Sequence, residues 1–263
     1  KRYKTIRKHS RKKRDYKVYY AKNRNHFHKL LMSKSRHLKG VSDAVDIVLS
    51  QCQNGRVIGG FIYMNHDLLS RNKYLIKNNI IKRDSSLRKR VGAPGIDLVK
   101  NEFVNTGSMK ASLYHLTHLI AFRHSLSEGD FENLLFTGTA HLNSGSRYDL
   151  NYVPAYSKTI DSTLSRVQWL KDYFFENNQQ IVLDYPKVKT GFNFGKRGNP
   201  QFSLNEFELL YDFFLNWKKD HVFKYGVECY YEGNSVIPDK VNVIIIDVTS
   251  NKLLVDVILG NYL

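Results

Sequence analysis

Residues that could carry out chemistry follow one another at fixed intervals in the middle of the chain. His118 lies in the apolar run Leu116–Ala121, and Asn133 and Asn143 follow it by 15 and 25 positions. A neutral imidazole, with an ordinary pKa of roughly 6.5, can take a proton from water near neutral pH. An asparagine carbonyl oxygen is a good ligand for a hard divalent cation. A histidine in an apolar run is most often a packed core residue, so the case for chemistry depends on the neighbouring motifs.

These motifs occur in a recognisable order. Asn133 opens the run Asn133–Thr139, Pro94-Gly95 precedes His118, and Val222–Val227 leads to Tyr231-Glu232-Gly233 and Ile237–Val241. In this order, over roughly residues 56–263 with a gap, they resemble the DNA/RNA non-specific endonucleases with a ββα-metal core, also called His-Me finger nucleases. The resemblance is closest to the streptococcal branch, which includes the streptodornase-type DNases and the nuclease of competent cells.

The resemblance implies metal-dependent hydrolysis of DNA, and also of RNA, without sequence specificity. It implies that His118 is the general base, that Asn143 ligates the metal and that Asn133 orients the water or the scissile phosphate. Glu208 fits best as the helical acid that holds metal-bound water, with Asp161 as the alternative. The expected cofactor is Mg²⁺, with Mn²⁺ as the alternative. Because Mg²⁺ keeps several of its waters, one asparagine carbonyl can suffice as protein ligand.

Two departures from the family pattern stand out. The segment His115-Leu116-Thr117 stands where the family has Asp-Arg-Gly, so both charged residues are replaced. Between Asn143 and the helix that normally follows, the chain adds an insert at about 146–201. The first departure motivates an alternative function, namely a catalytically inactive, nuclease-like protein that binds nucleic acid.

Hydrophobic periodicity predicts the elements that position these residues. Apolar residues at helical spacing predict helices at Val41–Gln53, Thr159–Asn177 and Leu204–Lys218, the last with Ser203 and Glu206 as a capping box. Runs rich in β-branched residues predict strands, and Tyr74–Arg83 is expected to be extended or turn-rich. The fold class is therefore α+β, with a central antiparallel sheet. The predicted strands are Arg56–Met64, Asn133–Thr139, Val222–Tyr231, Val241–Val248 and Leu253–Leu259.

The charge is concentrated at one end of the chain. Residues 1–40 hold 16 of the 41 Lys and Arg residues and a single acid, Asp15, so they carry most of the formal net charge of +17. We therefore expect a basic N-terminal arm, residues 1–40, before a nuclease domain at 41–263, and a like-charged arm of this kind is usually disordered in isolation. A polyanionic partner is expected. Candidate contacts to DNA are Arg88, Lys89 and Arg90, and Lys196 and Arg197 in a Gly-rich loop; a solvated charge patch is the alternative for each.

The remaining features of the sequence concern membrane association, localisation and cysteine pairing. A run of 18 apolar residues, which a transmembrane helix needs, does not occur, and no signal peptide is present in this sequence. The resemblance implies a secreted or cell-surface bacterial protein. An inhibitor partner and the oligomeric state are left open, as is whether Cys52 and Cys229 pair. A scaffold whose arm binds anionic lipid or wall polymer is a further alternative.

Overall fold

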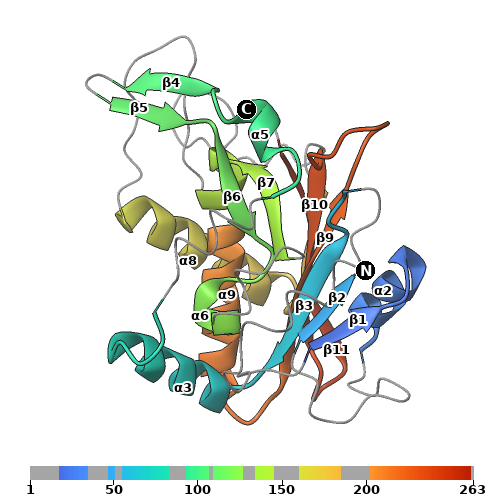
Figure 1. The fold of residues 1–263 in the computed structure, drawn as a ribbon. Coiled ribbons are helices and arrows are strands. Elements are labelled where there is room, and N and C mark those ends of the chain that lie inside the picture. The colour runs from blue at the N-terminus through green and yellow to red at the C-terminus, as the bar shows by residue number, and fades with distance from the viewer. Residues whose placement is uncertain are drawn as a thin grey trace.

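A mixed sheet with helices on both faces forms the centre of the molecule in a computed structural model (Figure 1). The structure describes residues 18–34, 47–50, 55–82, 93–106, 109–126, 134–144, 160–184 and 202–261. Within these ranges the sheet has seven strands in the order β1-β2-β3-β9-β10-β11-β8. Its strands are β1 (Val18–Ala21), β2 (Ile47–Ser50), β3 (Gly59–Met64), β8 (Ile181–Asp184), β9 (Phe223–Tyr230), β10 (Lys240–Asp247) and β11 (Lys252–Gly260).

The predicted antiparallel sheet is confirmed for its central strands and wrong at its edges. Strands β2, β3, β9, β10 and β11 pair antiparallel, whereas β1 pairs parallel to β2 and β8 pairs parallel to β11. Both edge strands come from segments that the sequence did not mark as strands. Seven of the eight residues of β10 are buried, because helices cover both faces of the sheet at this strand.

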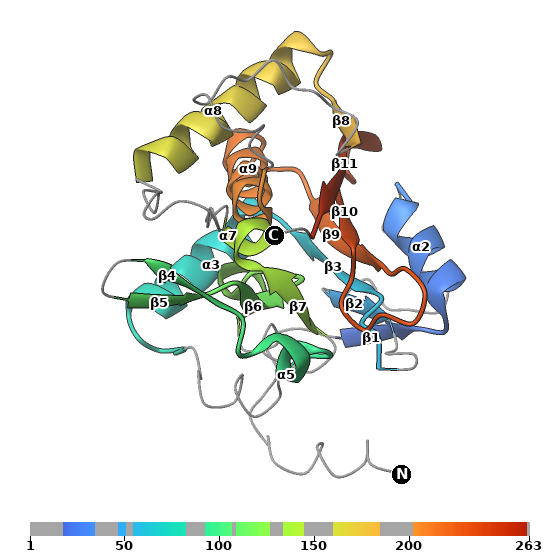
Figure 2. The same ribbon diagram turned by 90° about the horizontal axis from the view of Figure 1, so that it is seen from above.

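The helices lie in two layers, one on each side of the sheet (Figure 2). Helix α9 covers one face with α8 outside it, and α2 lies on the opposite face. In the described part of the chain, no helix is long and apolar enough to cross a membrane. The helices are α2 (Arg24–Met32), α3 (His66–Lys77), α5 (Ile96–Val99), α6 (Phe122–Ser125), α7 (Ala140–Ser144), α8 (Ile160–Glu176) and α9 (Leu204–Trp217).

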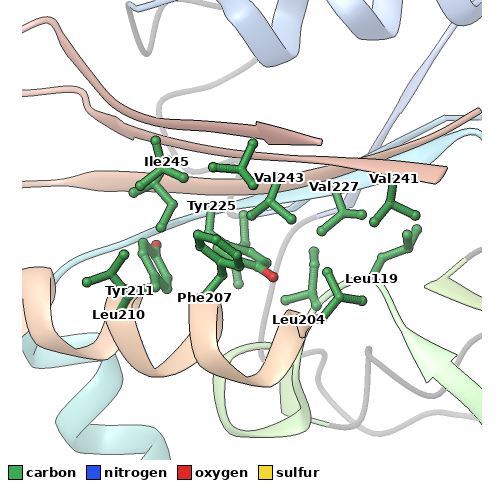
Figure 3. Close-up of a cluster of buried hydrophobic side chains, with 14 of the residues drawn as sticks. Leu119, Leu204, Phe207, Leu210, Tyr211, Tyr225, Val227, Val241, Val243 and Ile245 are labelled. Carbon is green, nitrogen blue, oxygen red and sulfur yellow. The ribbon is translucent and has the colours of Figure 1, made fainter. Parts of the chain in front are cut away.

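Helix α9 holds the main core in place. The predicted capping box is present: the Glu206 carboxylate accepts hydrogen bonds from the backbone and the hydroxyl of Ser203, both at 2.6 Å. Such a cap satisfies amides that the first turn otherwise leaves unpaired. Phe207, Leu210 and Tyr211 then face the sheet and pack under Tyr225 and Val243, among others (Figure 3). Complete burial of each aliphatic or aromatic side chain of this kind contributes about 2 kcal/mol.

Two local predictions are wrong. The segment 47–50 of the predicted helix Val41–Gln53 is strand β2, and His66–Lys77 is helix α3, which overlaps the segment expected to be extended. Ile47 and Val48 are consecutive and both are completely buried, each in a different core cluster on either side of the sheet. Pairing with β3 and burial on both faces therefore override the helical spacing.

Residues 18–34 of the basic arm are folded and cover the outer face of the sheet. Strand β1 extends the sheet, and Phe27 and Leu31 of α2 are completely buried. Gly226 of β9 allows α2 to approach this closely, since a Cβ atom there would lie 2.3 Å from a methyl carbon of Leu31. His28 Nδ1 lies 2.8 Å from the Glu228 carboxylate, at hydrogen-bond distance. The basic arm thus contains a helix whose apolar face packs on the sheet and buries it.

A buried lysine ends helix α2. The Lys224 ammonium donates hydrogen bonds to the backbone carbonyls of Leu30 and Leu31, both at 2.9 Å, and to that of Ser33. These carbonyls are among those that a helix leaves unpaired at its C-terminal end, where a positive charge is favourable. Burial lowers the pKa of Lys224 from 10.5 to about 7.

Candidate active site

The predicted site residues gather on a hairpin followed by a short helix. Strands β6 (Tyr114–His118) and β7 (Leu135–Thr139) pair antiparallel, with Tyr114 opposite Thr139 and His118 opposite Leu135. Helix α7 follows β7 directly and packs against both strands. The Thr139 hydroxyl accepts a hydrogen bond from the Leu142 amide at 3.1 Å and so begins the helix. Strands β4 (Phe103–Thr106) and β5 (Met109–Ser112) form a separate hairpin just before β6.

The motifs that are distant in the sequence meet around this hairpin. Thr137 of β7 donates a hydrogen bond to the Pro94 carbonyl at 2.7 Å. Gly95 has a left-handed backbone, with φ of 81°, and a Cβ atom there would lie 2.6 Å from the Ile237 side chain. The Pro94-Gly95 turn is therefore packed between β7 and the Ile237-Pro238 turn, which explains why glycine is needed there.

Asn261, which the sequence analysis did not single out, fixes β7 from the C-terminal end of the chain. Its side-chain oxygen accepts from the Thr139 amide at 2.7 Å, and its side-chain nitrogen donates to the carbonyls of Thr137 and Pro238 at 3.2 and 2.7 Å. One amide side chain thus joins the hairpin to the Pro238 turn. No local pattern marks this asparagine, because all three partners come from other parts of the chain.

Asn143 lies beside His115. The Asn143 side-chain nitrogen is 3.1 Å from His115 Nδ1, which links α7 to the first half of β6. Gly138 is the residue opposite His115 on β7, and a Cβ atom at Gly138 would lie 2.4 Å from the Thr117 hydroxyl. Because glycine has no side chain, the face of the hairpin under α7 has room for the contact between Asn143 and His115.

His118 is at the other end of β6. Because side chains alternate along a strand, His118 and His115 project from opposite faces of β6. His118 is 8% exposed, and the next residue, Leu119, is completely buried in the core with Leu204 and Val241 (Figure 3). The structure therefore brings Asn143 together with His115, and the apolar residue after His118 anchors the end of the strand.

Glu208 belongs to a cluster of charged side chains between α6 and α9. The Glu208 carboxylate is 3.6 Å from the Arg123 guanidinium, and Arg123 is 3.3 Å from Asp212, one turn further along α9. Asp212 also accepts a hydrogen bond from His124 at 2.6 Å and pairs with Lys73 of α3 at 3.4 Å. Helix α7 packs against α9, so this cluster and Asn143 are carried by elements in contact.

The electrostatics of this cluster centre on Asp212. Burial acts to raise the pKa of Asp212, but the hydrogen bond and charge of His124, with the charges of Arg123 and Lys73, lower it from 3.8 to about 2. Burial lowers the pKa of His124 despite the neighbouring carboxylate. Asp212 is therefore a stable anion at neutral pH that holds Arg123 toward Glu208. Arg123 and Asp212 were not predicted from the sequence, although each lies within five residues of a predicted site residue.

The donor set fits a cation that keeps its water. Among the described residues, no three His, Cys, Asp or Glu side chains are grouped so that they could enclose a metal ion. The Asn143 side chain could offer one neutral oxygen ligand, and a single protein ligand is compatible with Mg²⁺, which keeps several of its waters.

Several predicted residues lie outside the described part of the chain. These are Asn133, Cys52 and the candidate DNA contacts. Asp161 lies in the first turn of α8, but its side chain is outside the described part of the chain. Cys229 is buried in β9, and burial raises the pKa of its thiol. The candidate DNA contacts concerned are Arg88, Lys89, Arg90, Lys196 and Arg197.

Comparisons with known proteins give a distant likeness in structure. The sequence matches no protein-family model and no curated protein. The Sda1 nuclease with a bound zinc ion has a TM-score of 0.44 at 12% identity, over 83% of this chain and 75% of that one. An extracellular endonuclease has 0.43 at 17% identity, over 88% and 86%. NucA from Streptococcus agalactiae, with a magnesium ion bound, has 0.42 at 11% identity, over 86% and 77%. At these scores the likeness to the solved nucleases is distant and carries no conclusion about the activity of this chain.

Proposed function

We propose that this protein is a metal-dependent nuclease that hydrolyses phosphodiester bonds of DNA, and also of RNA, without sequence specificity. The observation that carries the proposal is the meeting of the separate sequence motifs around one ββα unit, β6-β7-α7. Thr137 is hydrogen-bonded to Pro94, Gly95 lies against Ile237, and Asn143 is on the helix of the same unit. We also propose, from the resemblance of the motifs, that the protein acts outside the cell.

The role of general base in the proposed reaction is assigned to His118 from the resemblance of the motif, although its side chain and that of His115, the contact of Asn143, project from opposite faces of β6. A neutral imidazole can remove a proton from the attacking water, and general base catalysis of this kind contributes about 10²- to 10⁴-fold in rate. The Nδ1 atom of His115 is engaged with the Asn143 amide, which makes His115 the weaker choice for this role. Packing of Leu119 in the core limits the movement of His118.

Asn143 holds the cation, for which we propose Mg²⁺ with Mn²⁺ as an alternative. A divalent cation bound there would neutralise charge on the phosphate and stabilise the leaving oxygen. Glu208, kept in place by Arg123, is the acid that orients water near the site, and Asn133 orients the water or the phosphate. The roles of Glu208 and Asn133 follow from the motif resemblance.

Substrate binding is electrostatic. With a net charge of +17, the chain attracts a polyanion, and phosphate contacts give affinity without reading sequence. We propose the basic arm, residues 1–40, together with Arg88–Arg90 and Lys196-Arg197, as the source of these contacts. Lys22 and Lys29 in the folded part of the arm are exposed, as this role requires.

Cleavage of supercoiled plasmid DNA tests the proposal. The wild type should nick the plasmid with Mg²⁺ and stop with EDTA, and His118→Ala should lose about 10²- to 10⁴-fold in rate. His66→Ala is the matched control, because His66 lies at the start of α3, outside the hairpin, α7 and the basic arm, and should leave the rate unchanged. Equal digestion by the wild type and His118→Ala would show that the assigned mechanism is wrong. The same assay with a single-stranded RNA measures the second substrate.

The burial of His118 favours a second candidate function. At 8% exposure the imidazole has little access to water, and Leu116 replaces the arginine of the resembled motif on the same face of β6. Both features suit a nuclease-like protein that binds nucleic acid without cutting it. Salt-dependent DNA binding with no cleavage under any divalent cation would favour this candidate.

A further inference from the structure

We propose that His115 is a positioning residue that sets the orientation of the Asn143 amide, so that the oxygen rather than the nitrogen faces the cation. This inference rests on the proposed function, because it takes Asn143 to be the metal ligand. It assigns a purpose to a histidine that stands where the resembled motif has aspartate.

The contact itself defines the orientation. The Asn143 side-chain nitrogen lies 3.1 Å from His115 Nδ1, and an amide nitrogen can only donate a hydrogen bond. Nδ1 therefore accepts, and the proton of the neutral imidazole is on Nε2. The Asn143 oxygen is then directed away from His115.

The orientation decides whether the residue can bind a cation at all. The two ends of an asparagine side chain have almost the same shape, but only the oxygen is a ligand, and the nitrogen presents two positively polarised hydrogens. A fixed acceptor at position 115 removes the wrong orientation. An aspartate at this position, as in the resembled motif, would also be an acceptor, so the substitution to histidine keeps this property.

The surrounding structure keeps the pair together. His115 is on the half of β6 that α7 covers, and Gly138 opposite it leaves room where a Cβ atom would lie 2.4 Å from Thr117. Thr139 starts α7 and thereby fixes where Asn143 falls on the helix. Partners of this kind behind a metal ligand typically change metal affinity 10- to 100-fold when they are lost.

A double-mutant cycle with direct measurement of Mn²⁺ binding tests the inference. The proteins are the wild type, His115→Leu, His115→Asp, Asn143→Ala, Asn143→Asp and the double variant His115→Leu/Asn143→Asp. Mn²⁺ alone is titrated by calorimetry and by electron paramagnetic resonance. Thermal unfolding without metal checks that each variant is folded. In Asn143→Asp both side-chain atoms that can face the cation are oxygens, so that background needs no orienting partner.

We expect His115→Leu to weaken Mn²⁺ binding about 10-fold or more beside Asn143, and less than about twofold beside Asn143→Asp. His115→Asp, which supplies an acceptor, should bind Mn²⁺ at least as tightly as the wild type. In a cleavage assay, His115→Leu should need more Mn²⁺ for half-maximal rate but reach the same kcat at saturation.

The possible contrary results are distinguishable. An equal loss from His115→Leu in both backgrounds would mean that His115 is a direct ligand or a structural residue, and would overturn the inference alone. No loss beside Asn143, while Asn143→Ala does weaken binding, would overturn it as well. If Asn143→Ala leaves Mn²⁺ binding unchanged, the metal role of Asn143 is wrong, and the inference falls with that part of the proposed function.

Discussion

Replacing Asp212 by Asn removes the anion at the centre of the charged cluster and keeps the size of the side chain. Asp212 holds His124, Arg123 and Lys73 at 2.6, 3.3 and 3.4 Å, and these groups lower its pKa from 3.8 to about 2. Each unit of such a shift corresponds to roughly 1.4 kcal/mol. Asp212 therefore contributes on the order of 2 kcal/mol to the free energy of unfolding at neutral pH.

The sign of this contribution gives a pH dependence that the variant must lack. A carboxyl group whose folded-state pKa is lowered stabilises the protein above its unfolded pKa of 3.8, and this stability is lost as the pH falls toward 2. About 1 kcal/mol of the difference between the wild type and Asp212→Asn should disappear between pH 5 and pH 3. Urea denaturation followed by the fluorescence of Trp169 and Trp217 measures both quantities.

The exposed Asp172 of α8 provides the matched control. Its carboxylate accepts a hydrogen bond from Gln168 at 2.8 Å, which an asparagine oxygen can also accept, so Asp172→Asn should change stability by less than about 0.5 kcal/mol. If Asp212→Asn costs no more than Asp172→Asn, the cluster does not stabilise the fold. If its cost is large but the same at pH 5 and pH 3, the lowered pKa is the wrong explanation.

Two further substitutions test other parts of the structure by the same denaturation assay. Gly138→Ala places a Cβ atom 2.4 Å from the Thr117 hydroxyl and should lower the free energy of unfolding by about 1–3 kcal/mol. Adding Thr117→Ala should recover part of this loss. An unchanged stability of Gly138→Ala would mean that the hairpin accepts the methyl group. Lys224→Met removes an ammonium whose pKa burial lowers from 10.5 to about 7, so the folded protein binds fewer protons than the unfolded chain between these values. The stability of the wild type relative to Lys224→Met should therefore rise as the pH increases from 7 toward 10.5, and a falling difference would contradict the lowered pKa.

The sequence predicted the strongly periodic elements well. Helix α9 with its capping box, helix α8 and strands β9, β10 and β11 lie where the patterns placed them, because each has a continuous apolar face that only one conformation can bury. Strand β2 and helix α3 were mispredicted for the opposite reason. A short run such as Ile47–Ser50 fits several conformations until its partner strand is known.

For the candidate site, the sequence determined the residue types and their order along the chain. His118, Asn143, Glu208 and the flanking Pro94-Gly95 and Ile237-Pro238 motifs could all be named from it, because motif spacing is a property of the chain. The folding of residues 18–34 onto β9 could not be predicted, since the apolar face of α2 is short and lies within a strongly charged segment.

Only the tertiary structure decided which of these side chains meet. It places Asn143 beside His115, and it joins Glu208 to Asp212 through Arg123. It also adds Asn261 as the link between β7 and the Pro238 turn. These contacts depend on strand register and on the face from which each side chain projects, and a shift of one residue would reverse the face. The sequence alone therefore identifies the candidate site residues, and the register of the hairpin determines which side chains each of them contacts.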